Sequence, residues 1–184
     1  MVQDKRTIKT ERAIRSTFIS LLHKKDIGRI TVSDICEGAC ISRNTFYSHY
    51  EDKYLLIQAM SKDFIGDLLN EVIAKNVIST YQSAISTTAW LFFDYLNEHG
   101  DEVRLLSKND PQFWQVFTGE MQTFMMSFSG TDDRNKVFVI YSSYAFTGCY
   151  REYFEGRITM KPSDFVQYLI EIAGRSNTFM QKEE

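Results

Sequence analysis

The stretch TVSDICEGACISRNTFYSHYEDKYLL, residues 31 to 56, contains two short helical patterns separated by about one turn. The second pattern begins after Ser42, whose hydroxyl can accept a hydrogen bond from the backbone amide of Thr45 and so cap a helix. A further helix is expected to begin after Asp52, another favoured capping residue. The first pattern has apolar residues spaced so that they share one helical face, namely Val32, Ile35, Cys36 and Ala39.

A longer amphipathic helix is expected upstream, from Thr7 to Lys24. Gly28 follows as a natural terminator, and Thr31 or Ser33 can cap the next helix. The N-terminal part of the chain is therefore predicted to be a three-helix unit with a helix-turn-helix. The apolar stripe of the upstream helix consists of Ile14, Phe18, Leu21 and Leu22.

A helix-turn-helix places its second helix in the major groove of DNA and presents side chains of its N-terminal end to the bases. We expect Phe46 and Tyr50 to turn inward, against Ile35 and Leu55. The residues predicted to contact DNA are Thr31, Ser42, Arg43, Asn44, Thr45, Tyr47, His49 and Lys53.

The chemistry of these side chains suits a duplex. Arg43 can make a bidentate contact with guanine or bind a phosphate, and Thr45 can donate to a phosphate or touch a thymine methyl group. Tyr47 can reach backbone oxygens. Thr31 and Lys53 lie at helix starts, where phosphate also meets backbone amides.

The charge distribution is compatible with such a surface. The whole chain of 184 residues has a net charge of -3, but residues 1–60 hold ten basic and seven acidic residues, a net charge of +3, which leaves -6 on the remainder. A mildly basic segment on an acidic chain fits one face that touches phosphates.

The rest of the chain is predicted to be helical as well, so that the fold class is all-α. Only 9 Gly and 2 Pro occur, and no strand-like alternation is sustained. VFVIY at 137–141 could be a strand, but it continues without a turn and a buried helix is favoured. The breaks fall at NEHGDE, SKNDPQ, FSGTDD and EGRITMKPSD, and the expected helices are 65–78, 81–99, 111–127, 134–154 and 162–179.

Compartment and cofactor follow from a few residue counts. Three cysteines are an odd number in a chain too large to need disulfides, which favours a reducing compartment and predicts a cytoplasmic protein. The N-terminal residues lack the apolar region of a signal peptide, and the uncharged stretch 76–93 is too polar to span a membrane.

Cys36, Cys40 and His49 are an incomplete ligand set for zinc. We expect neither a metal nor another cofactor, although a thiol sensor at Cys40 or Cys149 is an open hypothesis.

The segment ISRNTFYSHYEDKYLL, residues 41–56, with IKTERAIRSTFISLLHKK, residues 8–25, resembles the DNA-binding domain of the tetracycline-repressor (TetR) family. The shared features are the Ser or Thr cap, the aromatic-Tyr pair, the following aromatic residue and the acidic-Lys pair. The resemblance covers about residues 5–60. It departs from the family pattern at Cys40, where the turn usually carries glycine.

The resemblance implies a homodimer that binds a palindromic DNA operator and responds to a small-molecule effector of unknown identity. It also implies two domains, a DNA-binding domain at 1–52 and a helical effector-binding and dimerisation domain at 53–184. GCYREYFEGRITMKPSDFVQYLIEI, residues 148–172, looks like the paired last helices of one branch of the family.

Two further sets of residues are assigned with the help of this resemblance. The aromatic middle of the chain is expected to form an adaptable apolar pocket for the effector, at Trp90, Phe93, Trp114, Phe117, Met121 and Phe124. Ordinary core packing is the alternative at each position. The last two helices are expected to pair with their symmetry mates in a four-helix bundle, at Tyr141, Tyr144, Ala145, Gly148, Phe165, Leu169 and Ile172.

The functional prediction is a sequence-specific transcriptional regulator, more specifically a ligand-responsive repressor. A transcriptional activator is the first alternative, since the sign of regulation depends on where the operator lies. A helical enzyme is disfavoured, because the sequence offers no nucleophile-base ordering, phosphate-binding glycine loop or metal-ligand set. A protein-interaction module without DNA binding is the third possibility.

Overall fold

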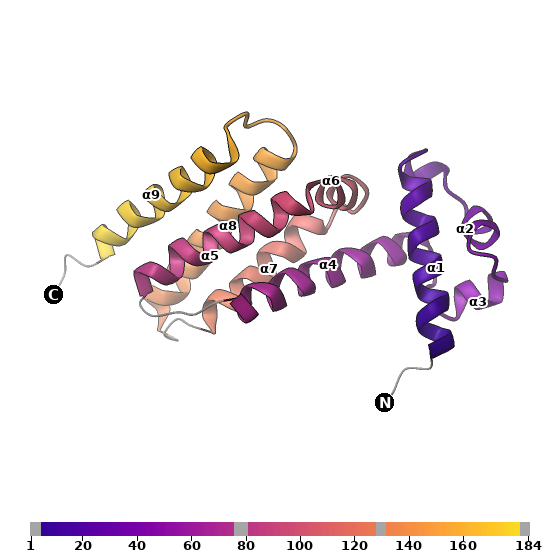
Figure 1. Cartoon of the computed structure of the whole chain (residues 1–184). Helices are drawn as coiled ribbons and strands as arrows, with labels where there is room; N and C mark the ends of the chain where they lie inside the picture. Colours follow the sequence, from indigo (N-terminus) through magenta and orange to yellow (C-terminus); the bar gives the residue numbers. More distant parts are fainter. Residues whose placement is uncertain (1–4, 76–80, 128–131, 181–184) are drawn as a thin grey trace. The chain divides into compact units, whose positions relative to one another are not determined.

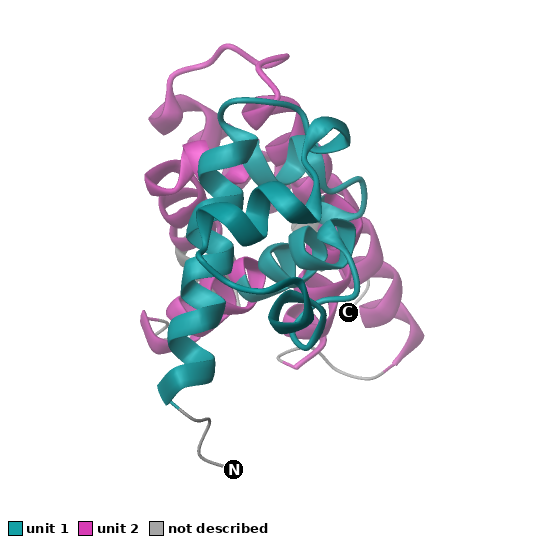
Figure 2. Cartoon of the chain, turned by 90° about the vertical axis from the view of Figure 1, so that its right-hand side faces the viewer, with its two compact units in different colours: residues 1–63, 105–113 teal, residues 64–104, 114–184 magenta. Residues whose placement is uncertain are grey.

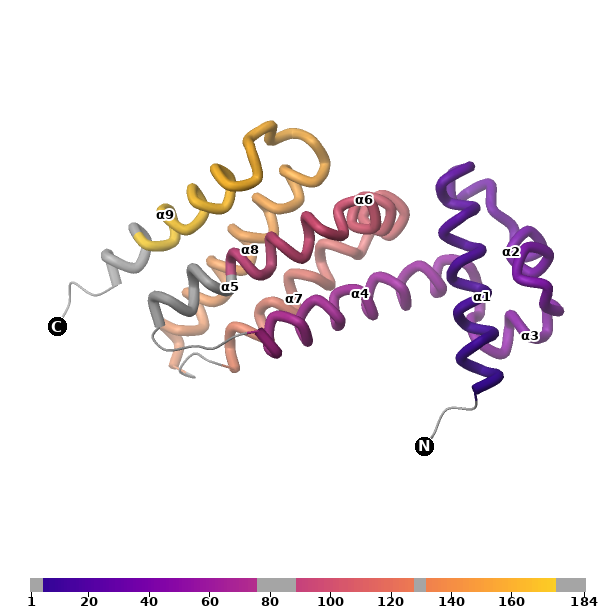
Figure 3. Tube along the Cα trace, viewed as in Figure 1, coloured from indigo at the N-terminus to yellow at the C-terminus, as the bar shows by residue number. Residues whose placement is uncertain are grey.

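The computed structural model describes the backbone of residues 5–75, 81–127 and 132–180, and the side chains of these ranges except 81–88 and 175–180. Over these ranges the regular structure is helical throughout, which confirms the predicted all-α class (Figures 1 and 3). The elements are α1 (Lys5–Leu22), the 3-10 turn η1 (Ile27–Arg29), α2 (Val32–Gly38), α3 (Arg43–Tyr47), α4 (Lys53–Lys75), α5 (Tyr81–Glu98), α6 (Gly100–Asn109), α7 (Phe113–Met126), α8 (Asp133–Phe154) and α9 (Pro162–Met180).

The chain forms two compact units, coloured separately in Figure 2. The head unit comprises the residues up to Asp63 together with Leu105–Phe113, and the body unit comprises Phe64–Arg104 together with the residues from Trp114 onward. The boundary between the units therefore falls inside α4. The domain division predicted after residue 52 lies at the start of α4 and stays a prediction.

The head unit is organised around one apolar core, in which α1 packs on α2 and α2 packs on α3. Burial of each large apolar side chain contributes about 1.5–3 kcal/mol to folding. This contribution is essential for α3, because a helix of five residues is not stable in water by itself. Five side chains of α1 to α4 in this unit have no solvent exposure, namely Ile14, Phe18, Ile35, Phe46 and Leu56.

Side-chain caps fix where the helices of the head unit begin. Ser42 accepts a hydrogen bond from the Thr45 amide at 3.1 Å, as the sequence predicts. Asp52 accepts from the amides of Tyr54 and Leu55 at 2.7 and 2.8 Å, which confirms the cap expected for α4. Because these caps satisfy amides that have no partner inside the helix, they set the register of α3 and α4.

Aromatic side chains form the core of the body unit, where α5 packs against α9. Tyr150 of α8 is almost completely buried, and its hydroxyl donates to the carbonyl of Ala89 at 3.2 Å. Phe165 of α9 stacks on Tyr153, with 4.4 Å between the ring centroids. None of the helices in the described residues combines the length and apolar character that a membrane crossing requires.

One expected helix boundary is wrong. The helix that begins after Asp52 does not give way to a second helix at residue 65; α4 runs without a break to Lys75. VFVIY, by contrast, lies inside α8, so the favoured helical interpretation is confirmed.

The helix α6 was not predicted, because the polar clusters at both of its ends merged into one apparent loop. Asp101 and Glu102 in its first turn favour a helix N-terminus, and Val103 and Leu106 give it a fully buried face. Its C-terminal part belongs to the head unit, where Lys108 pairs with Asp26 at 3.3 Å.

The turn between α2 and α3 yields a stability prediction. Cys40 has a φ angle of 54°, in the left-handed region, which costs about 1–2 kcal/mol for a residue with a side chain. Cys40→Gly removes this strain, and the greater freedom of glycine in the unfolded chain offsets part of the gain. We predict a net stabilisation of about 0.5–1 kcal/mol, measured by urea unfolding followed by circular dichroism.

The matched control is Ala39→Gly, since Ala39 is the adjacent residue and has a φ angle of -86°. This change relieves no strain and should destabilise the protein. Equal destabilisation by both substitutions would contradict the assigned strain at Cys40.

Candidate functional site

The helix-turn-helix is built by a tight connection between α2 and α3. Ala39 ends α2, Cys40 reverses the chain direction, and the amide of Ile41 donates back to the carbonyl of Cys36 at 3.0 Å. Ser42 then adopts an extended conformation and caps α3. The predicted motif is therefore present, with Cys40 in the conformation that glycine usually supplies.

The short helix α3 has one buried and one exposed side. Phe46 is fully buried, and Tyr50, just beyond the helix, is also buried, as predicted. Leu55, expected to pack against them, is instead 40% exposed, and its neighbour Leu56 is buried. Tyr47 points away from the core with 53% of its surface exposed, although its ring touches that of Phe46 edge-on at 5.6 Å. Among the residues predicted to contact DNA, Thr31, Ser42, Arg43, Asn44 and Tyr47 are exposed, and Thr45, His49 and Lys53 are half-buried.

Arg43 is held by a contact that the sequence did not reveal. Its guanidinium donates a short hydrogen bond to the hydroxyl of Ser33, ten residues earlier in α2. The sequence indicates Ser33 only as a possible cap, and Thr31 occupies that position instead. The pair links the exposed sides of the two helices of the motif.

Thr31 and Asp34 form a capping box at the start of α2. The hydroxyl of Thr31 accepts from the Asp34 amide at 3.1 Å, and the Asp34 carboxylate accepts from the Thr31 amide at 2.7 Å. Lys25 donates to the same carboxylate at 2.8 Å. The bond from Lys25, followed by those from Thr31, lowers the pKa of Asp34 to about 2.

Lys53 has a structural contact in addition to its predicted role. Its ammonium group donates to the carbonyl of Ile30 at 2.6 Å and to that of Gly28 at 3.2 Å. The first residue of α4 is thereby tied to the segment between α1 and α2. An ammonium group has three N–H donors, so these two bonds leave one for another acceptor.

Arg15 is at the centre of a polar cluster that connects α1 with α4 and with the end of the α3 region. It donates to Glu11 at 2.8 Å and to the hydroxyl of Tyr50 at 3.1 Å, and it pairs with Asp63 at 2.6 Å. Tyr50 in turn donates to Glu11 at 3.0 Å. The Glu11–Arg15 spacing of four residues indicates a helical pair, but no sequence signal indicates the contacts with Tyr50 and Asp63.

The residues predicted to line an effector pocket lie in α5 and α7, and the structure divides them into two groups. Phe117 and Phe124 both contact Phe92, with centroid distances of 6.1 and 5.7 Å. Phe93 packs on α8 and α9, where its ring lies 5.5 Å from that of Phe165. It shares one neighbour with Phe117, since both rings lie 6.4 Å from that of Tyr150. Phe93, Phe117, Met121 and Phe124 are buried, Trp114 is half-buried and Trp90 is exposed.

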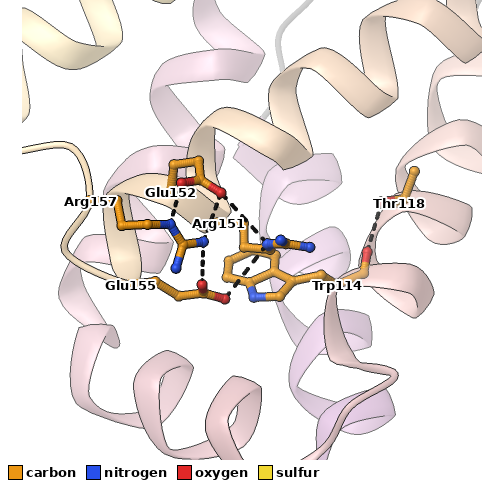
Figure 4. A network of polar contacts seen from close by, with 6 residues as sticks. All are labelled: Trp114, Thr118, Arg151, Glu152, Glu155 and Arg157. Carbon is orange, nitrogen blue, oxygen red and sulfur yellow. Dashed lines mark hydrogen bonds and ion pairs between the residues drawn. The ribbon is translucent and has the colours of Figure 1, made fainter.

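Ion pairs cluster where α8 ends (Figure 4). The guanidinium of Arg157 pairs with the carboxylates of Glu152 and Glu155, and Arg151 lies 3.7 Å from Glu155. The bond from Arg157 lowers the pKa of Glu152. The backbone turns at Gly156, which has a φ angle of 77°, and the amide of Arg157 donates back to the carbonyl of Glu152. The ion pairs therefore join the residues that form the C-terminal end of α8. Figure 4 includes the neighbouring α7, where the Thr118 hydroxyl donates to the Trp114 carbonyl at 2.7 Å.

The residues predicted for a dimer interface also divide into two groups. Phe165 and Leu169 are buried inside their own body unit. Tyr141, Tyr144, Ala145, Gly148 and Ile172 are exposed. Three large exposed apolar residues on the same helices were not predicted, namely Val137, Ile140 and Tyr168. We call the exposed residues of α8 at 137, 140, 141, 144, 145 and 148 the α8 face.

The cysteines differ in their surroundings. Burial raises the pKa of Cys149, and the carboxylate of Glu152 raises it further, so this thiol is poorly suited to react as a thiolate. Burial also raises the pKa of Cys36. Cys40 is exposed, with its sulfur 3.8 Å from the carbonyl of Glu37.

Known proteins with similar sequences are transcriptional regulators. The chain is 34% identical over 70 residues, 38% of its length and 18% of the relative, to the "Uncharacterized HTH-type transcriptional regulator YxbF" of Bacillus subtilis (strain 168). It is 28% identical over 120 residues, 62% of its length and 55% of the relative, to the "HTH-type transcriptional regulator EthR" of Mycolicibacterium smegmatis. The chain thus spans at most about half the length of these curated relatives. No protein-family model matches the chain.

Solved structures agree over nearly the whole chain. A TetR transcriptional regulator from Streptococcus agalactiae 2603V has a TM-score of 0.63 at 24% identity, over 94% of this chain and 98% of that one. The "Dihydroxyacetone kinase operon activator DhaS" has a TM-score of 0.64 at 19% identity, over 91% of this chain and 95% of that one. The chain therefore has the fold of TetR-type regulators, and the resemblance inferred from residues 5–60 is confirmed.

The capping box of α2 generates a prediction about pH. The pKa of Asp34 is lowered in the folded protein, so its contribution to stability is present above about pH 4 and is lost as the pH falls toward 2. Asp34→Asn should therefore be less stable than the wild type at pH 7, and the difference should close between pH 4 and pH 2. Urea unfolding at a series of pH values measures this difference.

Thr31→Ala serves as the comparison, since it removes the uncharged half of the same capping box. It should cost about 1 kcal/mol and depend less on pH than Asp34→Asn does, because Lys25 and the Thr31 amide still bond to the carboxylate. A destabilisation by Asp34→Asn that stayed constant down to pH 2.5 would show that the carboxylate charge does not contribute.

Proposed function

We propose that the protein is a sequence-specific DNA-binding transcriptional regulator that acts as a ligand-responsive repressor. The observation that carries this proposal is the two-sided nature of α3. Phe46 is buried in the core of the head unit, while Arg43, Asn44 and Tyr47 of the same capped helix are exposed. A rigid helix with hydrogen-bonding side chains at its N-terminal end is the arrangement that reads a major groove.

The exposed side chains supply both kinds of contact that a DNA reader needs. Arg43 offers a planar set of N–H donors for guanine or phosphate, and Asn44 can both donate to and accept from a base edge. Tyr47 and Thr45 offer hydroxyl groups to phosphate oxygens. We assign the roles predicted for Thr31, Ser42, His49 and Lys53 to the same surface, with Lys53 using the donor that its structural bonds leave over.

We further propose that the protein acts as a homodimer on a palindromic operator. The α8 face supports this proposal, because Val137, Tyr141 and Tyr144 are each more than half exposed on one helix. Small residues at Ala145 and Gly148 permit close approach of a second helix. A twofold axis would let the same face of two copies cover each other and would place two heads on two half-sites.

The effector is proposed to bind among the aromatic side chains of α5 and α7. Phe117 and Phe124 with Met121 provide an apolar lining whose methionine can adapt its shape. Binding there would regulate affinity for DNA without catalysing a reaction. The sign of regulation depends on the position of the operator, so activation is the alternative to repression.

Salt dependence tests DNA binding most simply. Duplexes recovered from a random-sequence pool should bind the wild-type protein with an affinity that falls steeply with salt, because phosphate contacts release counterions. Arg43→Ala should lose about 1–3 kcal/mol of discrimination for the selected sequence while the circular dichroism spectrum is unchanged. Fluorescence anisotropy at 50 to 200 mM salt measures both quantities.

Arg104→Ala is the matched control for this experiment, since Arg104 is an exposed arginine of α6 in the body unit, paired with Asp101 at 2.9 Å. It should bind DNA like the wild type. A tight complex without a salt slope, or equal losses for both variants, would refute the proposed contact surface.

The proposed dimer makes a separate prediction. Tyr144→Asp places a charge in the centre of the α8 face, and the cost of burying that charge against a second copy should shift the protein to monomers. Sedimentation velocity at micromolar concentration measures the change. Ile73→Asp, at a similarly exposed apolar residue of α4, should leave the dimer intact. A wild-type protein that sediments as a monomer would contradict the proposal.

A further inference from the structure

We propose that Ser33 is a positioning residue for Arg43 and that the pair makes each half-site select guanine at one position. This inference rests on the proposed function, because it concerns how the same surface distinguishes one DNA sequence from another. The juxtaposition that carries it is the hydrogen bond from the Arg43 guanidinium to the Ser33 hydroxyl, across the two helices of the motif.

Both residues are fixed by the local fold. Ser33 lies in the first turn of α2, whose start is set by the capping box of Thr31 and Asp34. Arg43 is the first residue of α3, directly after the Ser42 cap. Because both helix starts are set by caps, the two backbone positions from which these side chains extend are fixed by the motif.

Ser33 holds the arginine without neutralising it. Arg15, in the same unit, contacts the carboxylates of Glu11 and Asp63, so its charge is compensated within the protein. Across the described residues, by contrast, the hydroxyl of Ser33 is the hydrogen-bond partner assigned to Arg43. A neutral acceptor occupies one of the five N–H donors of a guanidinium and leaves the charge and the other donors for DNA.

The restraint has a consequence for recognition. A free arginine side chain samples many rotamers and loses that freedom when it binds, whereas a side chain that is already restrained loses less. Guanine presents its O6 and N7 acceptors side by side in the major groove, which matches the planar donors of arginine. Restraining the guanidinium direction favours this geometry over a contact with the more widely distributed phosphate oxygens.

The test compares selections from one random-sequence duplex pool by five proteins and one control variant. These are the wild type, Ser33→Ala, Ser33→Thr, Arg43→Ala and the double variant with both alanines. Ser16→Ala is the control, because Ser16 is an exposed serine of α1 whose hydroxyl donates to the carbonyl of Ala13 in its own helix. Sequencing of the bound fraction gives the preference for each base at each position.

We expect the wild type to prefer guanine at one position in each half-site and Arg43→Ala to lose that preference. Ser33→Ala should weaken the same preference about threefold to tenfold, as the loss of one typical solvent-exposed hydrogen bond would. It should leave the other positions unchanged. Ser33→Thr keeps the hydroxyl and should restore the preference, and the double variant should match Arg43→Ala alone.

Other outcomes separate this inference from the proposed function. If Ser33→Ala still changed the preference in the Arg43→Ala background, Ser33 would act on DNA directly and the positioning role would be wrong. If Ser33→Ala and Ser16→Ala both matched the wild type, only this inference would fail. If the wild type enriched no sequence, the proposed function would fail together with it.

Discussion

The burial of Phe46 is the constraint on which the rest of the head unit depends. A helix as short as α3 does not persist in water, so its position is fixed by this one fully buried ring and by the Ser42 cap. Once the ring is buried in the core, helical geometry turns the opposite side outward. The exposure of Arg43 and Asn44 is therefore a consequence of packing. The same packing keeps the exposed side of α3, the proposed recognition surface, rigid.

Polar contacts add a second level of order around this core. The cluster of Arg15, Glu11, Tyr50 and Asp63 joins α1 to α4, and Lys53 ties the start of α4 to the segment before α2. Each contact is partly exposed and contributes modestly to stability. Their shared effect is geometric: they hold α1 and the start of α4 in one arrangement around the helix-turn-helix. Arg43 is held by a neutral hydroxyl and Lys53 by neutral carbonyls, whereas Arg15 is paired with carboxylates.

Local patterns carried most of what the sequence could predict. Apolar spacing and capping residues identified α1, α2 and α3 and the inward turn of Phe46, because these depend on neighbours within a few residues. The bond between Ser33 and Arg43 and the contacts of Arg15 depend on tertiary approach, for which no local signal exists. α6 was missed because its buried face is short and its ends are polar. Tyr144 is exposed whereas Phe165 is buried, and this difference also depends on how the helices pack in the body unit.

Hydrogen-deuterium exchange of the protein with and without a duplex recovered from a random pool tests the central claim most directly. The account predicts slower amide exchange from residue 31 to residue 49 in the complex, where α2, the turn and α3 would be covered by DNA. Exchange in the core of α5 and α7 should change much less. Protection confined to the body unit, with the α2–α3 segment exchanging as fast as in the free protein, would contradict the account.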